Sequence, residues 1–232
     1  MFFDPLYLLI FIGFTVLGLI VQFRLRSVIE GAKKIPMTNG MTGRQVAEKM
    51  LRDHGIYDVK VMSVKGFLSD HYNPADKTIN LSPDVFGGNS AAAAAVAAHE
   101  TGHAVQHATG YGPLKMRSAI VPVVQVSSTI MNFLFIAMAF LAFGASFYNQ
   151  AILIFVICQA ALTVFALITL PVEADATRRG LAWLNNTGLT YGEQHRHAES
   201  ALRWAGRTYI VAALAAIAQL AYFLLMFANR RD

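Results

Sequence analysis

The chain has 232 residues, of which 55% are hydrophobic and 14% are charged, whereas a soluble domain carries roughly 25% charged residues. The formal charge of +5 comes with no nucleic-acid-binding motif, and the single cysteine, Cys158, excludes a disulfide scaffold or a cysteine-rich metal site. We therefore expect a membrane protein whose basic residues flank its spans.

Three long stretches, 5–23, 118–172 and 208–229, contain no charged residue. A helix crosses a bilayer in about 20 residues, so the 55-residue middle stretch must hold two spans, which we expect to join by a tight turn at 144–150. The sequence thus predicts four transmembrane helices, near 5–23, 120–145, 151–171 and 209–228. The first stretch lacks the basic start and the cleavage site of a signal peptide, which favours a retained anchor.

The distribution of Lys and Arg predicts the orientation of these spans. Twelve of the nineteen lie between Arg24 and Arg117, and five lie between Arg178 and Arg207. Basic loops stay in the cytoplasm, so segments 24–117 and 173–207 are expected there. The chain then divides into an anchor (1–23), a cytoplasmic region (24–117), a hairpin of two spans (118–172), a cytoplasmic helical segment (173–207) and a last span (208–232). Four spans place the C-terminus outside the cytoplasm, whereas the basic residues Arg230 and Arg231 favour the cytoplasmic side.

The cytoplasmic region opens with a predicted amphipathic helix that starts near Thr42 and ends at Gly55. Alternating apolar residues in 59–67, a turn signal at 73–76 and the segment 78–81 together predict a small β hairpin. Such a strand either holds an extended peptide by strand addition or is purely structural, and the sequence leaves both open.

Ser90 is a good helix N-cap, the run 91–98 is rich in Ala, and Gly110 followed by Pro113 is a stop signal. These signals predict one helix from Ala91 to about Ala108. A small residue within it, Gly102, can let another element pack closely.

This helix carries the sequence His99-Glu100-Thr101-Gly102-His103, which has the form H-E-x-x-H. Histidines at i and i+4 leave one helix face and can bind one Zn²⁺, while the glutamate between them can act as general base on a metal-bound water. His99 and His103 are therefore predicted zinc ligands, and Glu100 is the predicted catalytic base of a metallopeptidase.

Glu173 is the predicted third ligand, because it lies on the expected cytoplasmic side in a helix that continues out of the third span. Asp175 is two residues away and faces elsewhere, so we expect it to pair with Arg178 or Arg179. His107 lies about 12 Å along the helix from His99, too far to share its metal, which leaves it a supporting group or a helix-end cation.

The remaining histidines carry weaker predictions. The polar stretch 191–199 is expected to begin another helix, and its Tyr191, His195 or His197 is a candidate for stabilising an oxyanion, although a solvated face explains them as well. His54 and His71 are expected to be structural.

Four segments, 70–74, 81–85, 94–108 and 170–176, resemble the YugP-type membrane zinc peptidases, the neutral zinc metallopeptidases of bacterial inner membranes. The resemblance runs over nearly the whole chain. It implies a mainly α membrane protein with a cytoplasmic, zincin-like (gluzincin) catalytic region, and it carries the zinc-ligand role onto His99, His103 and Glu173 and the base onto Glu100. The related HtpX-like enzymes have an Asp four residues after the ligand Glu, where this chain has Thr177. Either Asp175 supports the site from another direction, or the third ligand differs.

The predicted function is zinc-dependent hydrolysis of peptide bonds, with protein or peptide substrates that include membrane proteins, and without nucleic acid. Two alternatives come from other classes. One is an intramembrane protease with the motif inside a span, although no span carries the second motif such enzymes need. The other is a non-catalytic membrane scaffold or assembly factor that keeps a zinc site.

Overall fold

The structure is a computed structural model that describes residues 4–66, 69–140 and 145–229. It divides into two compact units, each described here by itself. The helical unit comprises residues 1–19, 116–170 and 209–232, and the sheet-containing unit comprises residues 20–115 and 171–208.

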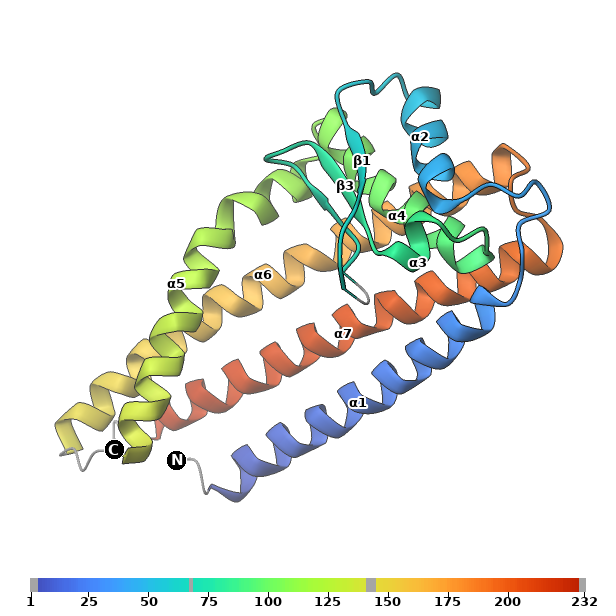
Figure 1. Cartoon of the computed structure of the whole chain (residues 1–232). Coiled ribbons are helices and arrows are strands. Elements are labelled where there is room, and N and C mark those ends of the chain that lie inside the picture. Colours follow the sequence, from blue (N-terminus) through green and yellow to red (C-terminus); the bar gives the residue numbers. More distant parts are fainter. Residues whose placement is uncertain (1–3, 67–68, 141–144, 230–232) are drawn as a thin grey trace. The chain divides into compact units, whose positions relative to one another are not determined.

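Four long helices supply the helical unit (Figure 1). They are α1 (Pro5–Lys33), α5 (Gly112–Phe140), α6 (Ala145–Asn186) and α7 (Gly192–Ala228), and each is long and apolar enough to cross a membrane. Inside the unit the rings of Phe155 and Phe223 stack with centroids 5.3 Å apart, whereas Leu9 is 70% and Phe133 is 72% exposed. An apolar exterior is what a bilayer solvates, so the described residues contain four helices able to cross a membrane, the number that the sequence predicts.

The break between the second and third spans differs from the prediction. α6 already begins at Ala145, so most of the turn predicted at 144–150 is helical instead. Its first residue, Gly144, lies outside the described residues, as do Arg230 and Arg231 at the C-terminus. Residues 145–150 can belong to α6 because they include no proline or glycine that would break a helix.

The sheet-containing unit is built around α4 (Ala91–Ala108), which agrees with the predicted helix at both ends. The Ser90 hydroxyl accepts a hydrogen bond from the Ala93 amide at 3.2 Å, and Gly110 ends the helix with φ of +67°. α2 (Gly43–Asp53) is likewise as predicted, with Thr42 as N-cap in a capping box with Gln45. α3 (Pro83–Phe86) is a single turn before α4.

The predicted hairpin is wrong in its pairing. The sheet has three strands, β1 (Lys60–Ser63), β2 (His71–Asn73) and β3 (Thr78–Leu81), in the order β1-β3-β2. β1 runs parallel to β3, and the antiparallel partner of β3 is β2, a strand of three residues that the sequence did not reveal. The central strand is favoured by burial, since Ile79 and Leu81 are fully enclosed in the core that α2 and α4 share.

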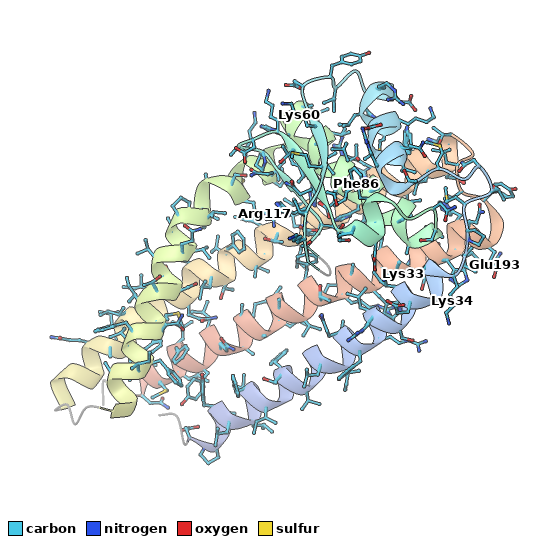
Figure 2. The ribbon with its side chains drawn as sticks, in the orientation of Figure 1. Lys33, Lys34, Lys60, Phe86, Arg117 and Glu193 are labelled. Carbon is cyan, nitrogen blue, oxygen red and sulfur yellow. The ribbon has the colours of Figure 1, made fainter. Side chains whose placement is uncertain are left out.

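Several basic side chains lie on the surface of this unit. Figure 2 shows Lys33 and Lys34 at the end of α1 and Lys60 on β1. Lys33 bridges to Asp84 at 3.0 Å, and the guanidinium of Arg44 lies 5.5 Å from the Phe86 ring. Lys34 and Lys60 are exposed, as expected for a solvated flank of membrane spans.

Candidate metal centre

Three side chains of types that can bind a metal meet between α4 and the polar end of α6. His99 and His103 leave the same face of α4, with ring centroids 4.8 Å apart. From α6, Glu173 Oε2 lies 3.2 Å from His99 Nε2 and 3.6 Å from His103 Nε2. One ligand atom from each residue lies within 4.8 Å of the others, so the structure brings together the three residues that were predicted as ligands.

These donors suit a zinc ion. Zn²⁺ takes imidazole nitrogens and carboxylate oxygens at about 2.0–2.2 Å, and a tetrahedron with those bonds has ligand atoms about 3.3–3.6 Å apart. The two histidine–carboxylate distances, 3.2 and 3.6 Å, match that spacing. His103 and Glu173 are buried, at 6% and 4% exposed, whereas His99 is partly accessible. A set of three protein ligands with one side open is typical of a catalytic rather than a structural zinc site.

Two glycines let α4 and α6 approach closely enough for this. A Cβ on Gly102 would lie 2.6 Å from the carbonyl oxygen of Ala176, and a Cβ on Gly180 would lie 2.9 Å from that of Ala98. Real Cβ atoms essentially never come within 3.0 Å of such an atom. The prediction that Gly102 admits a close neighbour is confirmed, and Gly180 is a second such position that sequence reasoning missed.

Each histidine is also held from its other nitrogen. The Thr177 hydroxyl lies 3.1 Å from His99 Nδ1, and Gln106 Oε1 lies 3.0 Å from His103 Nδ1. Thr177 is four residues after Glu173 and thus on the same face of α6, which is the sequence signal for its role. Gln106 was missed, although its i+3 spacing from His103 carries the same information.

Asp175 forms the ion pairs predicted for it, with both Arg178 and Arg179. In addition, its Oδ2 accepts a hydrogen bond at 3.0 Å from Gln106, the residue that contacts His103. Asp175 is therefore connected to the His103 side of the centre through Gln106, whereas the Thr177 hydroxyl lies next to His99.

Glu100 is buried, at 8% exposed, and sits beside the sheet. Its Oε2 accepts a hydrogen bond at 3.0 Å from the backbone amide of Tyr72 in β2. The Tyr72 hydroxyl lies 2.7 Å from His107 Nδ1, and burial raises the pKa of Tyr72 to about 12, so this phenol stays protonated at neutral pH. His107 thus supports β2 and does not join the three clustered residues, as predicted.

The electrostatics of the centre favour positive charge. Burial lowers the pKa of His103, but the hydrogen bond to Glu173 and the charges of Glu100 and Glu173 outweigh burial and raise the pKa overall. A buried site that stabilises an added proton between two carboxylates will also stabilise a cation in its place.

A pocket lies between the end of α4 and the sheet, where Ala104, His107 and Tyr72 contribute to its lining. Along α4, Ala104 is one turn beyond Glu100 on the same face. The pocket therefore offers room for a ligand group about one helical turn from the candidate base.

The other singled-out residues are held elsewhere. His54 Nδ1 contacts the Met50 carbonyl at 2.8 Å, and His195 Nδ1 contacts the Thr190 hydroxyl at 2.9 Å. Three further candidates also lie apart from the centre: His71, Tyr191 and His197. Among the described residues, none of these five side chains forms a hydrogen bond or ion pair with His99, His103 or Glu173. An oxyanion role for Tyr191, His195 or His197 stays a prediction.

Comparison with known proteins identifies the family of this chain. The family model described as "Putative neutral zinc metallopeptidase" matches residues 7–228, so the chain belongs to that family of zinc metallopeptidases. It is 36% identical over 227 residues to the "Putative membrane protease YugP" of Bacillus subtilis (strain 168), covering 97% of this chain and 99% of that protein. No solved structure matches.

Proposed function

We propose that this protein is a zinc-dependent membrane endopeptidase in which His99, His103 and Glu173 hold the metal and Glu100 is the general base. The observation that carries the proposal is the meeting of Glu173 with both histidines of the H-E-x-x-H motif, from a helix 74 residues away in sequence. When bound, Zn²⁺ lowers the pKa of a coordinated water to about 7 and polarises a peptide carbonyl.

Glu100 performs the proton transfers. One carboxylate oxygen, Oε2, is committed to the Tyr72 amide, which leaves Oε1 to take a proton from the attacking water. The same oxygen then delivers the proton to the amine that leaves when the peptide bond breaks. Because the Tyr72 amide fixes the carboxylate, little reorganisation is required at either step.

An extended substrate fits beside β2. This strand pairs with β3 on one side only within the described sheet, and it contacts Glu100 through its own backbone. Strand addition there would lay a peptide next to the base, and the pocket lined by Tyr72, Ala104 and His107 would receive one of its side chains. We extend the proposal to an inner-membrane location with the sheet-containing unit on the cytoplasmic side, since most Lys and Arg belong to segments 24–117 and 173–207.

The motif helix does not support the intramembrane alternative. α4 is not among the four candidate spans of the described residues, and it lies in the unit that carries the charged surface. The centre is assembled on the polar end of α6, after the apolar stretch that ends at Val172.

Glu100→Gln tests the proposal against the scaffold alternative. Glutamine keeps the size of the side chain but cannot take the proton, so zinc content should remain at one per chain while cleavage of an unfolded protein such as casein falls by about 10²–10⁴-fold. Glu48→Gln, on the outer face of α2, is the matched control and should cleave normally. Full activity of Glu100→Gln refutes the catalytic role, and a zinc-loaded but inactive wild-type protein supports a scaffold.

A further inference from the structure

Gln106 is a fully buried amide whose polar atoms are both engaged. Its Nε2 lies 2.8 Å from the backbone carbonyl oxygen of Val172 and 3.0 Å from Asp175 Oδ2. Its Oε1 lies 3.0 Å from His103 Nδ1. One side chain of α4 therefore connects a histidine of the centre to two acceptors on α6.

The chemistry of these partners determines how the amide is oriented. A backbone carbonyl can only accept, and so can the Asp175 carboxylate, which Arg178 and Arg179 hold in its ionised form. The end of Gln106 that faces them must be the NH₂ group. The carbonyl end must then face His103, because the reverse orientation would place oxygen against two acceptors in a buried site.

The orientation of the amide in turn determines the proton on His103. An amide oxygen can only accept, so His103 Nδ1 must carry a hydrogen and donate it. In the neutral imidazole, which is the form that binds a metal, this hydrogen leaves the lone pair on His103 Nε2, on the side of Glu173. The same logic does not apply to His99, since the Thr177 hydroxyl can either donate or accept.

We propose that Gln106 is a positioning residue that presets the Nδ1–H tautomer of His103 before metal binds, and that Asp175 and the Val172 carbonyl hold Gln106 in the orientation this requires. The inference rests on the proposed function, because it takes His103 Nε2 as a metal ligand. It assigns unequal roles to the two histidines: Gln106 fixes the hydrogen of His103 on Nδ1, whereas Thr177 leaves either nitrogen of His99 open to the hydrogen.

The first test reads the tautomer in the metal-free wild-type protein, at a pH high enough for the His103 ring to be neutral. ¹⁵N NMR of the histidine-labelled full chain in detergent distinguishes a protonated Nδ1 from one with a lone pair, and loss of the signal in His103→Asn assigns it. We expect His103 Nδ1 to carry hydrogen, and a His103 Nδ1 without hydrogen overturns the proposal. This measurement needs no Gln106 variant to fold.

The second test compares Gln106→Leu with Gln194→Leu as matched control. Gln194 is also a buried amide of the sheet-containing unit, and it donates to the Pro36 carbonyl at 2.7 Å without touching the centre. Competition with a chromophoric chelator should show zinc affinity 10–100-fold weaker in Gln106→Leu and unchanged in Gln194→Leu. In metal-free Gln106→Leu, read at the same high pH, the hydrogen of the neutral His103 ring should redistribute toward Nε2.

The outcomes separate this inference from the proposed function. Wild-type zinc affinity and an unchanged tautomer in Gln106→Leu overturn the role of Gln106 while the metal site stands. A wild-type protein that binds no zinc overturns the proposed function, and the tautomer of its His103 is read independently.

Discussion

Replacing Gly102 by alanine should separate α6 from α4 and weaken the metal site. The new Cβ would start 2.6 Å from the Ala176 carbonyl oxygen, and ordinary contact begins at 3.4 Å, so the two backbones must part by about 0.8 Å. Glu173 is three residues from Ala176 on the same helix and must move with it. Zinc sites tolerate only about 0.2 Å in ligand distance, so a shift of this size is several times too large.

The magnitude follows from two opposed effects. Overpacking costs about 1–3 kcal/mol, whereas alanine gains about 1 kcal/mol over glycine in a helix, so the metal-free protein should lose about 0–2 kcal/mol of stability. Zinc affinity has no such compensation and should fall about 10–100-fold, which corresponds to about 1.4–2.8 kcal/mol. Metal affinity is therefore the more sensitive measurement.

A graded series makes the test sharper. A Cβ on Gly180 would start 2.9 Å from the Ala98 carbonyl oxygen, so Gly180→Ala requires the helices to part by less than Gly102→Ala does. It should therefore weaken zinc binding less. Gly206→Ala in α7 meets open space and should leave affinity unchanged while raising thermal stability slightly. Chelator competition gives the affinities, and thermal unfolding in detergent gives the stabilities. Wild-type affinity in Gly102→Ala, or equal losses in all three variants, would refute the close-approach reasoning.

Two further predictions concern the same unit. Thr177→Val keeps the shape of the side chain but removes the hydroxyl oxygen that lies 3.1 Å from His99 Nδ1. Zinc affinity, measured by chelator competition, should therefore fall by about tenfold or more. An unchanged affinity would contradict a supporting role for this hydroxyl. Tyr57 is 82% exposed, so Tyr57→Cys in a Cys158→Ser background can report the orientation of the sheet-containing unit. A membrane-impermeant maleimide should label this cysteine only after the cells are permeabilised. Labelling of intact cells would contradict the proposed cytoplasmic side.

Where sequence reasoning succeeded, the deciding interactions are local. The ends of α4 follow from the Ser90 cap and the Gly110 stop, and the four spans follow from stretches without charge. Glu173 could be predicted for a related reason. The predicted membrane topology limits which acidic residues lie on the same side of the membrane as the H-E-x-x-H helix.

The sheet shows where such reasoning ends. β1 and β3 are separated by a segment long enough for either direction of pairing, and the residue pattern of each strand is the same in both. The direction depends on how the strands pack over α4, which no short window of sequence contains. β2 escaped notice because three residues carry too little pattern to predict a strand.

By itself, the sequence determined the motif helix, the membrane spans and the three residues that meet as candidate ligands, because each depends on local periodicity, capping or charge. Only the tertiary structure decided that Gly180 lies against Ala98 and that Gln106 joins His103 to Asp175. The Gly180–Ala98 and Gln106–Asp175 contacts link residues 69 or more positions apart, and they exist because α4 and α6 approach closely at Gly102 and Gly180.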